Sequence, residues 1–133
     1  MNMRLRLMGS MPERIDAACD ALSWGYPREV PLQEVEASAW YRLGLGVVFW
    51  FHRVRGEPDG DVFVHLAVAP EARGHWPIAD LAVLCRRFAE LHGGTRLRYL
   101  RGEERDDDME AALARFGWYE VPDGLARDLE PLA

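Results

Sequence analysis

One stretch constrains the fold of this chain more than any other: an apolar strand leads through a short Arg-Gly loop into a helix. Residues 61–69 form the strand pattern, which ends at Pro70, and Arg73-Gly74 follow in the loop. Residues 78–92 place apolar side chains on one helical stripe, and two glycines after them are typical of a helix C-cap. A glycine-bearing turn before a helix N-terminus presents backbone N–H groups together, so this stretch predicts an anion-binding turn.

Length and charge set the class of protein. The 133 residues, 49% of them hydrophobic, are enough for one domain spanning residues 1–133 with a buried core. The net charge of −6 argues against sequence-independent binding to nucleic acid or to an anionic membrane. No apolar run reaches the ~20 residues of a membrane span, and the N-terminus lacks the long apolar core of a secretory signal. We therefore expect a cytoplasmic protein.

Periodicity predicts the other elements. Strands are expected at residues 3–8, 40–43, 47–55 and 95–100 and in a terminal hairpin over 118–129, and helices at 11–23 and 109–116. Strand 61–69 should run antiparallel to strand 47–55, and residues 28–39 support at most a short helix. The order predicts a mixed α/β fold in which an antiparallel meander feeds a crossover helix.

The first predicted helix has a candidate cap and a candidate core face. Ser10 is a suitable N-cap, and Ile15, Ala18, Cys19 and Leu22 recur at helical spacing. Cys19 and Cys85 both lie on apolar faces of predicted helices. We expect buried thiols in a reducing compartment rather than a disulfide.

Residues 66–74, Leu-Ala-Val-Ala-Pro-Glu-Ala-Arg-Gly, resemble the central motif of the GNAT acetyltransferase superfamily, in which a strand ends in Val-x-Pro-x-x-Arg-Gly. The Gly117-Trp118 pair is similar to the Gly-Phe pair that opens the family's last hairpin, and the element order matches along the chain. Small phage-encoded GNAT-like proteins share this shape. The resemblance implies a mixed, mostly antiparallel sheet of six to seven strands flanked by three to four helices.

The resemblance also implies acetyl-CoA as the cofactor. The main chain of the strand would face the thioester and pantetheine, and the loop would contact the pyrophosphate. The residues so implied are Leu66, Ala67 and Val68 in the strand and Arg73, Gly74 and His75 in the loop. A substrate amine would approach from the first helix and residues 24–40.

Several residues depart from the family pattern. Trp76 and Ile78 stand where the loop has small residues, Pro77 has no N–H to donate, and Asp80 places a carboxylate in the first helical turn. Near the chain end, Asp106 and Leu113 occupy the positions of a frequent Asn and of a Tyr general acid. The loop of this chain is therefore degenerate by comparison with the family.

Candidate catalytic groups each have a structural alternative. His65 is the preferred general base. His65, and His52 on the adjacent strand, could each instead be a buried imidazole whose hydrogen bonds are satisfied by a neighbour. Tyr119 or Tyr99 would be the acid. Trp24, Tyr26, Trp40 and Tyr41 either line an acceptor pocket or pack in the core.

Other kinds of site find less support. Asp106, Asp107 and Asp108 are explained by the charge preference of a helix N-terminus rather than by a cation site. The sequence shows no metal-ligand spacing and no nucleophilic triad.

Two functions follow. The first is an acyltransferase that moves acetyl from acetyl-CoA to a primary amine of a small molecule or protein, with His65 as base and Tyr119 as acid. The alternative is a catalytically inactive member of the fold that serves as an interaction or structural module, such as a phage virion component or a host-directed factor. It would bind a protein partner or form a homo-oligomer.

Overall fold

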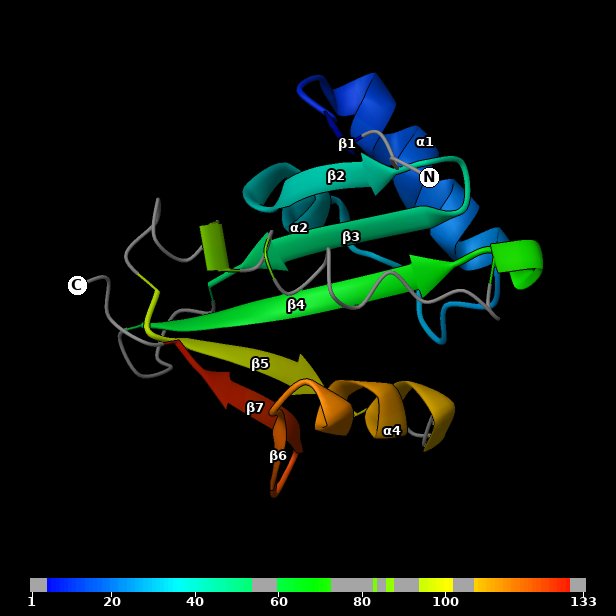
Figure 1. Cartoon of the computed structure of the whole chain (residues 1–133). Coiled ribbons are helices and arrows are strands. Elements are labelled where there is room, and N and C mark those ends of the chain that lie inside the picture. Colours follow the sequence, from blue (N-terminus) through cyan, green and yellow to red (C-terminus); the bar gives the residue numbers. More distant parts are fainter. Residues whose placement is uncertain are drawn as a thin grey trace. The chain divides into compact units, whose positions relative to one another are not determined.

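The computed structural model describes residues 5–53, 60–72, 83, 86–87, 94–101 and 107–129. Its strands form one seven-stranded sheet in the order β1-β2-β3-β4-β5-β7-β6 (Figure 1). The strands are β1 (Leu5–Leu7), β2 (Ala39–Leu43), β3 (Val47–His52), β4 (Asp61–Val68), β5 (Arg96–Leu100), β6 (Tyr119–Val121) and β7 (Gly124–Asp128). The helices are α1 (Met11–Ser23), α2 (Leu32–Ala37), the 3-10 turn η1 (Pro70–Ala72) and α4 (Asp107–Arg115). The predicted mixed, mostly antiparallel sheet is confirmed.

The contacts divide the chain into two compact units. The first comprises Met1–His52 and His65–His75, and the second comprises Arg53–Val64 and Trp76–Ala133, so β4 contributes one half to each. The two units are described separately below, and a single domain over residues 1–133 stays a prediction. None of the helices in the described part of the chain is both long and apolar enough to span a bilayer.

In the first unit, α1 begins where its capping residues dictate. The Ser10 hydroxyl accepts from the Glu13 N–H (3.3 Å), and the Glu13 carboxylate accepts from the Ser10 N–H (3.2 Å), which is a complete capping box. The core face of α1 consists of Ala17 and Ala21, both fully buried. These small side chains allow the helix to approach two large indole rings of the sheet.

The predicted core face of α1 is therefore only partly right: Ala18 packs against the core, but the other three predicted residues are exposed. Ile15 and Leu22 are 41% and 46% exposed, and the thiol of Cys19 is exposed rather than buried. Cys85 lies outside the described residues. The first strand is at the sheet edge, where β1 pairs with β2: Leu7 is 60% exposed, whereas Met8, which follows it, is buried.

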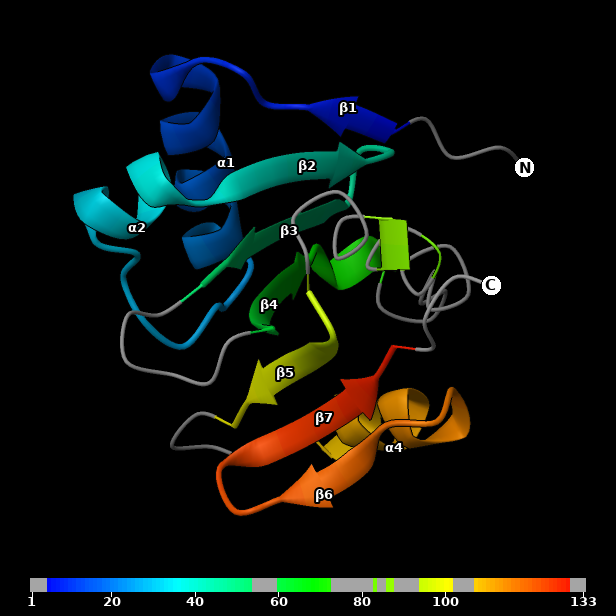
Figure 2. The same ribbon diagram turned by 90° about the vertical axis from the view of Figure 1, so that its left-hand side faces the viewer.

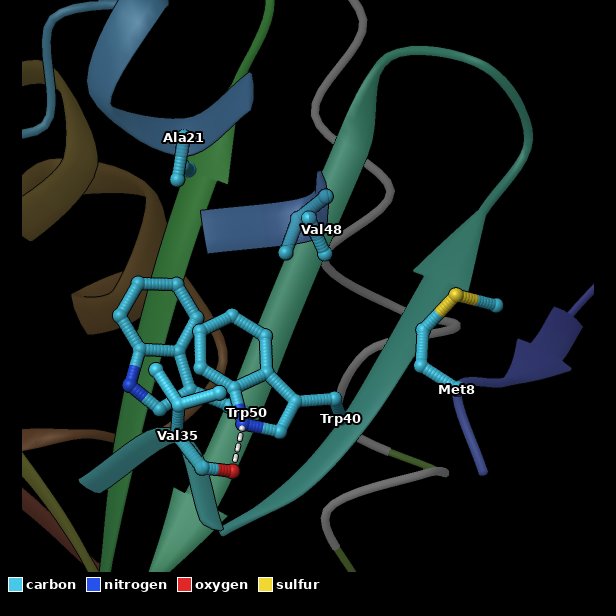
Figure 3. Close-up of a cluster of buried hydrophobic side chains, with 8 residues drawn as sticks. Met8, Ala21, Val35, Trp40, Val48 and Trp50 are labelled. Atoms are coloured by element: carbon cyan, nitrogen blue, oxygen red, sulfur yellow. Dashed lines mark hydrogen bonds between the residues drawn. The ribbon is translucent and has the colours of Figure 1, made fainter. Parts of the chain in front are cut away.

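The core of the first unit lies between the two helices and one face of the sheet (Figures 2 and 3). The rings of Trp40 and Trp50 stack at 4.4 Å with 11° between their planes. Trp40 Nε1 donates to the carbonyl of Val35 in α2 (3.0 Å), which ties that short helix to the sheet although no side chain caps it. Of the two roles considered for Trp40, lining an acceptor pocket or packing in the core, the structure therefore shows core packing.

In the second unit, β5 pairs with β4 on one side and with β7 on the other. The parallel ladder joins residues 61–63 to residues 96–98, and β7 and β6 continue the sheet as an antiparallel hairpin. Figures 1 and 2 both show α4 beside this hairpin. Asp61, at the start of β4, is buried and accepts hydrogen bonds from Arg96 and Arg98.

The bounds of most elements agree with the periodicity within a few residues. Helix 11–23 and strands 40–43, 61–69 and 95–100 are all present. The predicted helix over residues 78–92 lies outside the described residues except for Val83, Arg86 and Arg87, which are helical. The short helix in residues 28–39 is α2.

Candidate functional site

A cluster of polar side chains lies where β3 ends and β4 passes beside it. The Ala69 N–H donates to the Gly46 carbonyl (2.8 Å), and His52 meets His65, so the two strands run in opposite directions. Strand alternation places His52 on the same face as Trp50, and His65 on the same face as Ala67. Trp50 and Ala67 belong to the core beneath α1 and α2, so both imidazoles face these helices.

The two histidines are in direct contact. Their Nε2 atoms are 2.6 Å apart, and the rings lie 9° from parallel with centroids 4.8 Å apart. The Nδ1 atom of His65 lies 3.0 Å from the hydroxyl of Tyr26, which is on the loop between the two helices. Trp50 stacks on the His65 ring at 5.2 Å, so His65 is held by one ring and two polar partners.

Glu34, on α2, completes the cluster. Its Oε1 lies 3.8 Å from Nε2 of His52, and its Oε2 accepts from Nε1 of Trp50 (2.9 Å). Arg28 donates to both oxygens of the same carboxylate at 3.1 and 3.0 Å. Two donors thus fix the orientation of the carboxylate beside the histidines, and every residue of the cluster belongs to the first unit.

Burial determines the ionisation of this cluster. It lowers the pKa of His65 to about 3, helped by the neighbouring His52 and opposed by Glu34. It also raises the pKa of Tyr26 to about 12. Burial works to raise the pKa of Glu34, but hydrogen bonds from Trp50 and Arg28 outweigh it and hold this pKa below its usual value. At neutral pH the cluster therefore contains a carboxylate, a phenol and a neutral His65.

Neutral His65 has two hydrogen-bonding arrangements. If Tyr26 donates to Nδ1, the ring carries its proton at Nε2 and donates to His52. If Nδ1 carries the proton and donates to Tyr26, Nε2 accepts from His52. The two arrangements differ by proton shifts along one line of atoms, so Tyr26, His65 and His52 form a route for moving a proton.

The structure brings some predicted residues together and leaves others outside this cluster. His65 and His52 are in contact, and Tyr26 joins them. In β4, Ala67 and Val68 are buried and Leu66 is half-buried. The residues of the loop and its flanks lie outside the described part of the chain: Arg73, Gly74, His75, Trp76, Pro77, Ile78, Asp80 and Asp106.

The candidate acid lies on a different element. Tyr119 is on β6, is 41% exposed, and donates its hydroxyl proton to Asp128 (2.8 Å). Leu113, at the family's usual Tyr position, is buried in α4. The acid role of Tyr119 stays a prediction.

Sequence reasoning missed Glu34 and Arg28. Both lie in residues 28–39, where no clear period or cap is present, and the Trp50 and His52 partners of Glu34 are on a distant strand. The one local signal is that a basic and an acidic residue lie six positions apart, on either side of the turn into α2, where they form an ion pair.

Comparison with known proteins identifies the fold. No family profile and no curated protein sequence matches this chain. Among solved structures, a proposed phosphinothricin N-acetyltransferase matches with a TM-score of 0.72 and 14% identity, covering 97% of this chain and 99% of its own. A GNAT-family acetyltransferase from Staphylococcus aureus Mu50 matches with a TM-score of 0.71 and 8% identity, covering 96% and 100%.

A third structure contains a ligand. A proposed acetyltransferase from Salmonella typhimurium, solved with its cofactor acetyl-CoA, matches with a TM-score of 0.67 and 14% identity, covering 100% of this chain and 97% of its own. At these identities the likeness concerns the fold alone. The chain has the fold of the GNAT N-acetyltransferases along its whole length.

Proposed function

We propose that this protein transfers an acetyl group from acetyl-CoA to a primary amine of a small molecule or protein. One observation carries the proposal: His65, a buried neutral imidazole, lies in the strand that leads to the Arg-Gly loop and is hydrogen-bonded to Tyr26. Tyr26 comes from the segment on the side where the family resemblance expects the amine. The GNAT fold and the acetyl-CoA in one structural neighbour support the same reading.

The described part of the chain is compatible with acetyl-CoA. Among the described residues, the parallel ladder of β4 ends at Phe63, whereas the strand continues to Val68. The main chain of Leu66, Ala67 and Val68 would hold the pantetheine amides, and Arg73, Gly74 and His75 would hold the pyrophosphate. Acetyl-CoA supplies a thioester activated toward an amine, and backbone N–H groups of the strand would polarise its carbonyl.

The role of His65 is to pass a proton on. Burial lowers the pKa of His65 to about 3, so the ring is neutral at pH 7 and a proton taken from the amine does not stay there. His52 lies 2.6 Å away, and the Glu34 carboxylate lies 3.8 Å beyond the contact nitrogen of His52. The proton would move from His65 through His52 toward this carboxylate and on to water, because the lowered pKa of Glu34 means that it does not keep the proton. The amine nitrogen would form its bond to the acetyl carbon as the C–S bond breaks, and CoA would leave as a thiolate that Tyr119 would protonate, while the strand holds the reacting groups in place.

Calorimetric titration of the full chain with acetyl-CoA and CoA is the first test. We expect saturable binding that Arg73→Ala weakens at least tenfold, while Arg6→Ala, a matched exposed arginine on β1, leaves it unchanged. Absence of binding at millimolar acetyl-CoA would overturn the proposal and favour the inactive interaction module.

The second test measures catalysis. Thiol release from acetyl-CoA is followed with a panel of primary amines. His65→Gln should lower kcat at least a hundredfold without changing the affinity for acetyl-CoA, because the side chain acts on the amine rather than on the cofactor. Equal kcat values for the variant and the natural chain would remove His65 from the mechanism.

A further inference from the structure

We infer that Glu34, His52 and His65 form a binding site for one divalent transition-metal ion of the zinc type. Their ligand atoms all lie within 4.8 Å of one another, in a structure in which these three side chains come from α2, β3 and β4. Two imidazole nitrogens and one carboxylate oxygen are a known zinc ligand set that leaves a fourth position for water. Metal binding does not require acetyl-CoA, so this inference is tested separately from the proposed function, although it uses the same three side chains.

The separations suit a tetrahedral ion. Zinc bonds of 2.0–2.1 Å place ligand atoms about 3.3 Å apart in a tetrahedral site. The two Nε2 atoms are 2.6 Å apart and Glu34 Oε1 is 3.8 Å from Nε2 of His52, so the observed values lie on either side of this distance. Binding would separate the two Nε2 atoms, turn the rings so that their lone pairs converge, and bring the carboxylate closer to His52. A contact of 2.6 Å is also short for a hydrogen bond donated by N–H.

The surroundings orient the ligands as they do in metal sites. A metal-binding histidine almost always donates its other ring N–H to an oxygen, and the Tyr26 hydroxyl lies 3.0 Å from Nδ1 of His65. Trp50 donates to Oε2 of Glu34, and Oε1, which accepts from Arg28 (3.1 Å), is the oxygen near His52. When both rings carry their proton at Nδ1, each Nε2 offers a lone pair and binding releases no proton, but the two nitrogens face each other and the rings must turn for both lone pairs to reach one ion.

The burial and the chemical type of the three ligands favour a transition-metal ion over calcium or magnesium. The side chains of His52 and Glu34 are 12% and 17% exposed, and His65 is 6% exposed, so the ligands are largely shielded yet reachable. Calcium and magnesium prefer sets of oxygen ligands, whereas imidazole nitrogens suit zinc, cobalt and nickel. Arg28 opposes a cation because it pairs with the same carboxylate, but its side chain is 41% exposed and has room to turn away.

Titration of the chelator-treated, tag-free full chain with Zn²⁺ tests the inference, with Co²⁺ as a spectroscopic probe. We expect one equivalent of Zn²⁺ to bind and Co²⁺ to give the visible absorption of a tetrahedral site. His52→Ala and Glu34→Gln should each weaken binding at least tenfold. Cys19→Ser, which removes an exposed thiol, should leave it unchanged. Arg28→Met should tighten it, because a competing cation is gone.

Two further measurements separate a lost ligand from a lost fold. Circular dichroism and thermal unfolding establish that each variant folds, and Zn²⁺ should raise the unfolding temperature of the natural chain but not of His52→Ala. Bound Zn²⁺ would also occupy Nε2 of His65 and inhibit acetyl transfer. Failure to bind Zn²⁺ at tenfold molar excess, or undiminished binding by a folded His52→Ala variant, would overturn the metal site without bearing on acetyl-CoA binding.

Discussion

Replacing Asp61 by Asn should destabilise the protein by about 3 kcal/mol. The buried Asp61 carboxylate accepts from Arg96 through Nε (2.9 Å) and Nη2 (2.8 Å), and from Nη1 of Arg98 (3.0 Å). A hydrogen bond to a charged group contributes about 1.5–3 kcal/mol. The Arg98 side chain is only 9% exposed, so its bond counts nearly in full. The Arg96 side chain is 32% exposed, so water hydrates its guanidinium once the carboxylate is replaced. Its two hydrogen bonds together therefore contribute only about 1 kcal/mol.

Urea unfolding followed by circular dichroism measures this loss, with Asp123→Asn as the matched control. Asp123 also pairs with Arg98, but its side chain is 54% exposed, so its removal should cost under about 1 kcal/mol. A loss below 1 kcal/mol for Asp61→Asn would refute the reasoning that burial makes this ion pair strong.

The same variant has a pH signature. Hydrogen bonds from Arg96, and from Arg98, hold the pKa of Asp61 below its usual value despite burial. A lowered folded pKa means that the stabilisation is complete above the unfolded pKa of about 3.9 and is lost as pH falls through the folded value. The difference in unfolding free energy between the natural chain and Asp61→Asn should therefore be constant from about pH 5 to 8 and shrink below pH 4. A difference that persists at pH 2 contradicts this account.

Four further substitutions test separate features. Ser10→Ala removes the cap of α1 and should cost about 1 kcal/mol in urea unfolding. Trp40→Phe should cost about 2 kcal/mol, since it removes indole contacts and the donor to the Val35 carbonyl; a loss under 0.5 kcal/mol would mean that the core tolerates the gap. Tyr26→Phe should cost about 1 kcal/mol and lower kcat at least tenfold, because Nδ1 of His65 loses its partner. Tyr119→Phe should lower kcat about a hundredfold with little change in stability, and an unchanged kcat would contradict its acid role.

Local patterns predicted the elements well. The Ser10 capping signature and the apolar spacing placed α1 at its observed bounds. The apolar run that ends at Pro70 and the turn glycines after residue 43 placed β4 and β2 within a residue of their ends. The predicted core face of α1 was right for Ala18 but wrong for Ile15 and Leu22, which are exposed, and it missed the buried Ala17 and Ala21. A helix with apolar residues on more than one side does not reveal which side meets the large rings of Trp40 and Trp50.

The candidate site depended on contacts between distant residues. His65 was identified from its strand and from the family motif, but no local pattern indicated that Glu34, His52 and Tyr26 would surround it. Strand pairing brings the two histidines together, and the packing of α2 on Trp40 brings Glu34 beside them. The low pKa of His65 follows from burial, which the sequence alone does not state.

The sequence by itself thus determined the order and type of the elements and the strand that leads into the Arg-Gly loop, because spacing and caps act over a few residues. Only the tertiary structure decided which imidazoles touch, which carboxylate they face and that the thiol of Cys19 is exposed. Those properties arise from the register in which separate strands pair and from the packing of helices on the sheet. They depend on the combined packing of side chains that lie far apart in the chain.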